Sequence, residues 1–124
     1  MKLCPCHSSK SYKTCCKTFH DGTLPNTPTE LMRSRYSAYS MGLNDYIMKT
    51  THPMNPQAHQ SETPYKGLNF YGLTIITEKI DGDKGWVTFI ANIKQLNQDL
   101  SFKEKSTFIK ENGQWLYLAG EVVT

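Results

Sequence analysis

All four cysteines of this chain lie within its first sixteen residues, as Cys4, Cys6, Cys15 and Cys16. Two close pairs separated by a short loop can fold back on each other, and four thiolates complete the tetrahedral shell that Zn²⁺ prefers. So short a segment has too little apolar content to fold on a core of its own, so metal binding would supply its folding free energy. We therefore expect a structural zinc site, with no open position for catalysis or for His7 or His20 as further ligands.

Two other uses of the thiols remain open. Pairing within either couple would strain a disulfide, whereas pairing between the couples is feasible in an oxidising compartment. Redox or nucleophilic chemistry more often uses a lone activated thiol or a Cys-x-x-Cys pair. The spacing in this chain favours metal binding over both.

Positive charge surrounds the cysteines. No acidic residue precedes Asp21, whereas the same stretch contains Lys2, Lys10, Lys13 and Lys17. Because a zinc ion with four thiolates is itself negative, these lysines partly neutralise the site. The formal net charge of the whole chain is only +3. A dedicated nucleic-acid-binding protein usually has a larger excess of positive charge.

The apolar residues are distributed as in a water-soluble protein. No apolar run approaches the ~18 residues that a membrane-spanning helix needs. The first residues also lack the apolar stretch of a secretory signal. We expect a cytoplasmic protein that does not bind membranes.

The middle of the chain predicts helices. After a linker over residues 17–27, Thr27 is expected to cap a helix that starts at Pro28 and runs to about Met41. Glu30 would complete a capping box, and Gly42 is the expected stop.

A second helix and then a series of strands follow. The helix is expected from an N-cap at Asn44 to a point before Pro53, followed by an irregular or briefly helical stretch to residue 64. Period-two alternation then predicts strands over residues 68–79, 86–94, 100–110 and 115–122, with turns at 81–83, 97–99 and 112–113. Helices followed by an antiparallel sheet indicate the α+β class.

Two motifs carry a resemblance to a known family. The run Cys-Pro-Cys, eight residues and Cys-Cys, with Lys10 to Lys13 inside it, resembles the SEC-C motif. The run Leu-Met-Arg-Ser-Arg-Tyr-Ser-Ala from Leu31, with Glu111–Trp115, resembles the YchJ-like family of small bacterial proteins. This implies a SEC-C zinc knuckle over residues 1–20 and a nuclear transport factor 2-like domain over residues 27–124, with a curved four-stranded antiparallel sheet around the helices.

This sequence departs from the family in two respects. The motif commonly has glycines where this chain has His7 and Ser9, so the turn has to accept side chains there. Family members often carry a second SEC-C motif at the C-terminus, and this sequence contains one only, so we expect no role that needs two.

The resemblance also implies a cavity at the wide end of the cone. Its candidate lining residues are Arg33, Arg35, Tyr36, Tyr39, Asp45 and Trp115. Either arginine would hold Asp45 or an anionic ligand, although core packing is the more common role of such aromatics. Asp45 and His52 are the only acid–base candidates near the second helix, so we expect binding rather than catalysis and name no catalytic residue.

The resemblance implies a macromolecular contact as well. The similar motif of the SecA translocation ATPase engages a secretory chaperone and the ribosome. We therefore expect an adaptor whose knuckle binds a protein or the ribosome through Lys10, Tyr12, Lys13 and Lys17. The alternatives are a small-molecule-binding or enzymatic cone with purely structural zinc, and a knuckle that binds RNA by stacking Tyr12 and Phe19 on bases. The open sheet also favours a homodimer.

Overall fold

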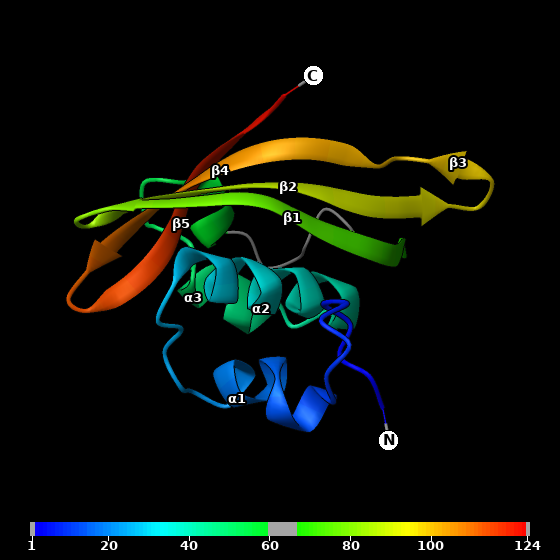
Figure 1. The fold of residues 1–124 in the computed structure, drawn as a ribbon, viewed down its shortest axis with the longest axis horizontal. Coiled ribbons are helices and arrows are strands. Elements are labelled where there is room, and N and C mark those ends of the chain that lie inside the picture. Colours follow the sequence, from blue (N-terminus) through cyan, green and yellow to red (C-terminus); the bar gives the residue numbers. More distant parts are fainter. Residues whose placement is uncertain (1, 60–66, 124) are drawn as a thin grey trace.

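The protein has three layers: a curled antiparallel sheet, helices against one face of it, and a cysteine-rich unit on the far side of those helices (Figure 1). A computed structural model describes residues 2–59 and 67–123. Residues 2–20, here called the cysteine unit, contain the short helices η1 (Tyr12–Thr14) and α1 (Cys16–His20). The order of helices before strands confirms the predicted α+β class.

The central layer is helix α2 (Pro28–Met41), and its ends are the predicted ones. The Thr27 side chain accepts a hydrogen bond from the Glu30 N–H at 3.1 Å. Gly42 ends the helix in a left-handed conformation with φ 73°. The reciprocal bond of the capping box is displaced by one residue, because the Glu30 carboxylate accepts from the N–H of Asn26 at 2.7 Å.

Helix α3 (Asn44–Lys49) connects α2 to the last strand. Its N-cap is Leu43, so the prediction that Asn44 would be the cap is wrong by one residue. The chain after α3 pairs with the sheet: the Tyr117 N–H donates to Thr50 O at 2.8 Å, and the His52 N–H donates to Tyr117 O at 2.8 Å. A further short helix, η2 (Pro56–His59), lies in the stretch predicted to be irregular or briefly helical. The rest of that stretch, residues 60–64, lies outside the described residues.

The sheet is antiparallel, with the strand order β1-β2-β4-β5 and the short β3 paired with β2. The strands are β1 (Asn69–Asp81), β2 (Lys84–Gln95), β3 (Gln98–Asp99), β4 (Phe102–Glu111) and β5 (Gln114–Val122). The turn at Asn112-Gly113 has positive φ at both residues, 53° and 77°, which suits a two-residue hairpin. The predicted strands are confirmed, with longer bounds for β1 and β2.

The predicted turn over residues 97–99 is wrong. The hairpin closes at Leu96 and Asn97, and the pairing of Lys94 with Asp99 continues the register of β2 with β4. β3 is therefore the beginning of the β4 strand, separated from it by an interruption. The Ser101 side chain causes the interruption, because its hydroxyl accepts the Ile93 N–H at 3.1 Å.

Irregular pairing curls the sheet around α2. The register shifts twice between β1 and β2, at Phe70/Gly72 and at Ile75/Thr77, and once between β4 and β5, at Thr107/Phe108. Such bulges bend a strand and increase its twist. The inner face of β2 alternates as predicted and buries Val87, Phe89, Ala91 and Ile93 against Leu31, Met32 and Tyr36 of α2.

Candidate metal centre and ligand cavity

The four cysteines meet in one cluster. Their sulfur atoms all lie within 4.8 Å of one another, and the Cys6 and Cys15 sulfurs are 3.6 Å apart. Cys4, Cys6 and Cys16 are buried, Cys15 is half-buried, and all four are free thiols. A tetrahedral zinc ion with Zn–S bonds of ~2.3 Å would hold its sulfurs about 3.8 Å apart. The four side chains therefore fit a metal ion that prefers thiolates.

A tight turn and a helix start bring the cysteine pairs together. The Cys4 N–H donates to Lys10 O at 2.8 Å, which folds the first pair back toward the second. Within this turn His7 and Ser9 have φ 62° and 70°, the left-handed region that favours glycine. Cys16 is the first residue of α1, so the second pair lies at the beginning of that helix.

The buried thiols share protons unevenly in the metal-free chain. A hydrogen bond from the Cys16 side chain lowers the pKa of Cys6 to about 4. The same hydrogen bond, followed by burial, raises the pKa of Cys16, and burial raises that of Cys4 to about 11. The lowered pKa favours the thiolate at Cys6 and the raised pKa values favour protonated thiols at Cys4 and Cys16, whose protons a metal ion would displace.

The cysteine unit is fixed to the outer side of α2. The Arg33 Nη1–H donates to Cys6 O at 3.0 Å. His20 Nε2 lies 2.8 Å from Ser34 O; because this carbonyl accepts, Nε2 carries the proton and Nδ1 accepts from the Tyr12 hydroxyl at 2.8 Å. Burial lowers the pKa of His20, in keeping with this neutral ring. Arg33 was expected in the cavity and instead faces the cysteine unit.

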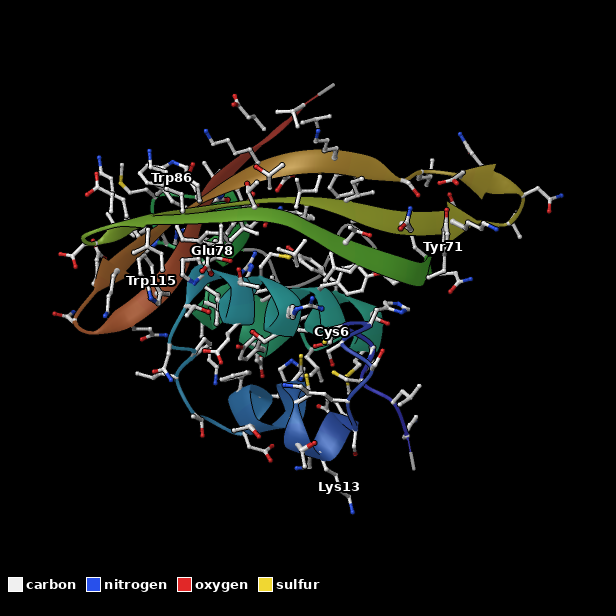
Figure 2. The ribbon with its side chains drawn as sticks, in the orientation of Figure 1. Cys6, Lys13, Tyr71, Glu78, Trp86 and Trp115 are labelled. Carbon is white, nitrogen blue, oxygen red and sulfur yellow. The ribbon has the colours of Figure 1, made fainter. Side chains whose placement is uncertain are left out.

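Of the four residues predicted to bind a partner, two are lysines whose side chains are exposed to solvent. Lys10 and Lys13 are exposed, and Figure 2 shows Lys13 directed away from the rest of the molecule. Lys17 pairs with Asp21 at 2.5 Å. Tyr12 is half-buried, and its hydroxyl lies 2.8 Å from His20 Nδ1.

A cavity of about 110 Å³ lies on the inner side of α2, against the sheet. Of the predicted residues, Arg35, Tyr36 and Tyr39 line it. The full described lining is Met32, Arg35, Tyr36, Tyr39, Gln57, Phe70, Phe89, Ala91, Ile93, Phe102, Glu104, Ser106 and Tyr117. Most of these residues are apolar or aromatic, with a small group of polar side chains among them, as is usual for a small-molecule site.

Arg35 is the buried cation of this cavity, with 4% of its surface exposed. Its Nη1 donates to Ile47 O at 3.1 Å and to the hydroxyls of Thr50 and Thr51 at 2.9 and 2.8 Å. The guanidinium also lies over the Tyr117 ring, 4.5 Å from its centroid. Burial lowers the pKa of Arg35, but from so high a value that the group stays charged.

Two further residues expected in the cavity lie elsewhere. Asp45 is exposed on α3, beside a surface hollow that it shares with His20 and Lys49, so it does not pair with either arginine. Trp115 is 3% exposed in the core, where its Nε1–H donates to Asn26 O at 3.2 Å. The core interpretation of the aromatics thus holds for Trp115 and Phe108, whereas Tyr36 and Phe89 belong to both core and cavity.

Glu104 also lines the cavity, although it was not among the residues predicted to do so from the sequence. Its carboxylate accepts from the Ser106 hydroxyl at 2.7 Å, and both residues line the cavity from β4. The signal was present in the sequence, because Glu104 alternates with Phe102 and Phe108 on one predicted strand face. Two adjacent polar residues, Glu104 and Ser106, between the phenylalanines of one strand face are the kind of departure that marks a polar site.

No helix in the described part of the chain is both long enough and apolar enough to cross a membrane.

Comparison with known proteins supports both halves of this architecture. Residues 27–120 match the family model described as YchJ, middle NTF2-like domain. Among relatives, a UPF0225 protein of Deinococcus radiodurans is 39% identical over 119 residues, covering 94% of this chain and 87% of its own length. A UPF0225 protein of Vibrio parahaemolyticus is 35% identical over 122 residues, covering 94% of this chain and 73% of its own length.

Two solved structures resemble the whole chain. A SEC-C motif containing protein from Rhodopseudomonas palustris has a TM-score of 0.85 and 31% identity, with 98% of each chain covered. A second such protein, from Psychrobacter arcticus, has a TM-score of 0.81 and 27% identity, covering 100% of this chain and 84% of its own. The cysteine cluster, the curled sheet and these matches together show that the chain belongs to the YchJ-like UPF0225 family, with a SEC-C motif followed by a nuclear transport factor 2-like domain.

Proposed function

We propose that the protein is a zinc-stabilised binding protein of the cytoplasm whose cavity holds a small molecule. The observation that carries this proposal is the cavity of about 110 Å³ with the buried Arg35 guanidinium on its wall. Four thiolates are the ligand set of structural zinc sites, and cytoplasmic thiols stay reduced. With its ligand shell complete, the zinc ion contributes folding free energy and no reaction step.

The two sites share one helix, which supports a division of labour between them. α2 directs Arg33 outward to Cys6 O and exposes Arg35 and Tyr36 to the cavity on its other side. Because the cysteine unit holds the outer side of α2, the side chains on the cavity side of this helix have a defined arrangement. Preorganised side chains bind a ligand with a smaller entropic cost.

A cavity-filling variant tests the proposal. Ala91 is 2% exposed and lines the cavity, so Ala91→Leu would place a larger side chain in the ligand space. We expect small molecules from a fragment screen by NMR to bind the zinc-loaded wild type and not the Ala91→Leu variant. Thr88→Leu, at a half-buried position of the same strand outside the cavity lining, is the matched control. If no fragment binds in a manner that Ala91→Leu abolishes, the proposal is wrong.

The adaptor role is a second candidate, favoured by the exposure of Lys10 and Lys13 on the cysteine unit. Two exposed cations beside a rigid metal site would steer an acidic protein or ribosomal surface toward this end of the molecule. Pull-down from the native cell should lose the partner with Lys10→Glu combined with Lys13→Glu, and keep it with Lys105→Glu on the sheet. A partner that survives the double substitution contradicts this role, and ribonuclease-sensitive capture would indicate RNA instead.

A further inference from the structure

The cavity has two opposite charges on its wall. Arg35 reaches it from α2, and Glu104 reaches it from β4. The ion pairs found among the described residues are Lys17 with Asp21 and His52 with Glu111, so the Arg35 guanidinium has no carboxylate within 4.0 Å there. A buried cation and a nearby carboxylate that do not touch leave a desolvation cost only partly offset. A ligand between them would offset more of it.

Each charged group is held in place by its own contacts and keeps capacity for a ligand. The Arg35 Nη1 is engaged by Ile47 O and two threonine hydroxyls, whereas Nη2 has the Tyr39 hydroxyl at 3.4 Å. A guanidinium has five N–H donors, so in its contacts with the described residues Arg35 still has donors on Nη2 and Nε for a carboxylate. On the other side, the Ser106 hydroxyl donates to Glu104 Oε2 at 2.7 Å. Since a carboxylate has about four acceptor sites, Glu104 can still accept from an ammonium group.

The remaining wall is apolar and limits the size of the ligand. Its apolar side chains come from α2 and from the inner face of the sheet: Met32, Phe70, Phe89, Ala91, Ile93 and Phe102. The volume of about 110 Å³ is somewhat smaller than the ~150 Å³ apolar cavity that accepts benzene. A ligand with a few carbons in its apolar part fits this space.

We propose that the cavity binds a zwitterionic α-amino acid with a short apolar side chain, with its carboxylate on Arg35 and its ammonium group on Glu104. This inference rests on the proposed function of the cavity as a small-molecule site and names the class of its ligand. A simple carboxylate would put a second negative charge near Glu104, and a simple amine would put a second positive charge near buried Arg35. A zwitterion pairs a carboxylate with Arg35 and an ammonium group with Glu104 in one molecule.

Three matched compounds test the proposal on the zinc-loaded full chain by isothermal titration calorimetry. L-Valine carries both charges, isovalerate lacks the ammonium group, and isobutylamine lacks the carboxylate. We expect L-valine to bind about tenfold more tightly than either analogue, since each analogue loses one charge-assisted hydrogen-bonded contact. Equal or tighter binding of isovalerate or isobutylamine overturns the zwitterion while leaving the cavity a small-molecule site. Absence of L-valine binding also overturns it, and the fragment screen with Ala91→Leu then decides separately on the proposed function.

A conservative variant tests whether Glu104 binds the ammonium group of the ligand. Glu104→Gln keeps the size of the side chain and an acceptor for Ser106 but removes the negative charge. We expect it to weaken L-valine about tenfold and to leave isovalerate as tight as before or tighter. Glu121→Gln removes an exposed carboxylate outside the cavity lining and should change neither affinity. An unchanged L-valine affinity in Glu104→Gln would overturn the assignment of the ammonium group to Glu104.

Discussion

At the scale of single residues, His7 and Ser9 adopt a backbone conformation that costs free energy. Both lie in the left-handed region, with φ 62° and 70°. His7 gains contacts in return: its Nε2 lies 3.3 Å from Phe70 O, and its ring meets that of Tyr36 edge-on at 5.9 Å. Ser9 is exposed. The turn thus accepts both side chains, but the net free-energy cost is smaller at His7, whose contacts offset part of the strain, than at the exposed Ser9.

Ser9→Gly should stabilise the zinc-loaded protein by about 0.5–1 kcal/mol, because the strain of a left-handed serine exceeds the extra entropy of glycine in the unfolded chain. Thermal unfolding followed by circular dichroism measures the effect. His7→Gly relieves the same strain but loses the contacts with Phe70 and Tyr36, so its gain should be smaller or negative. A lower melting temperature for Ser9→Gly would contradict strain at this position.

The raised pKa values of Cys4 and Cys16 make metal binding sensitive to pH. In the metal-free chain Cys4 stays protonated up to a pKa of about 11, and the pKa of Cys16 is raised as well, so both thiols must lose a proton to bind zinc. Zinc affinity should therefore rise with pH between 6 and 8, with release of protons. Calorimetry in buffers of different ionisation enthalpy counts those protons. Equal apparent enthalpies in all buffers would show that the thiols are already deprotonated.

At the scale of elements, the sequence predicted those features that depend only on residues close together in the chain. The ends of α2 follow from Thr27 and Gly42, whose side-chain bond and left-handed φ need no distant partner. The interruption at Ser101 was not predictable, because it depends on a hydroxyl that meets Ile93 across the hairpin. The bulges of β1 and β5 likewise depend on pairing between strands.

The candidate site divides in the same way. The cysteine spacing alone indicated the cluster. Arg33 and Arg35 could not both face the cavity, because residues two apart in a helix point about 200° from each other. Which of them faces inward depends on where the cysteine unit packs, and this is tertiary information. Glu104 was visible in the strand alternation, but only the fold shows that it lines the same cavity as Arg35.

The link between the cysteine unit and α2 should weaken in acid. His20 donates from Nε2 to Ser34 O and accepts at Nδ1 from Tyr12, so protonation of Nδ1 breaks the Tyr12 bond. Burial lowers its folded pKa below the unfolded value, so its contribution to stability is present above pH ~6.5 and is lost as pH falls through the folded pKa. Acid should lower the melting temperature of the wild type more than that of His20→Gln, measured at equal zinc occupancy. An equal loss in both proteins would contradict this role.

At the scale of the whole molecule, the three layers connect the metal site to the cavity through α2 (Figure 1). The cysteine unit contributes the bonds of Cys6 O and His20 to one side of the helix. The sheet holds the other side, where the Tyr36 hydroxyl donates to Gly72 O at 2.7 Å. If zinc binds the four cysteines and supplies the folding free energy of the cysteine unit, its removal takes away one of the two sets of contacts that hold α2.

Zinc removal should therefore raise amide hydrogen exchange in α2 about tenfold or more and leave β2 and β4 protected, since the sheet keeps its own ladder and core. Exchange measured by mass spectrometry before and after chelation checks this. Arg33→Met in the zinc-loaded protein loses only the bond to Cys6 O, so it should show part of the same increase with full zinc content. Lys13→Met, on the exposed side of the cysteine unit, should show none. If α2 exchanges equally with and without zinc, the sheet alone holds the helix, and the metal would then stabilise only residues 2–20.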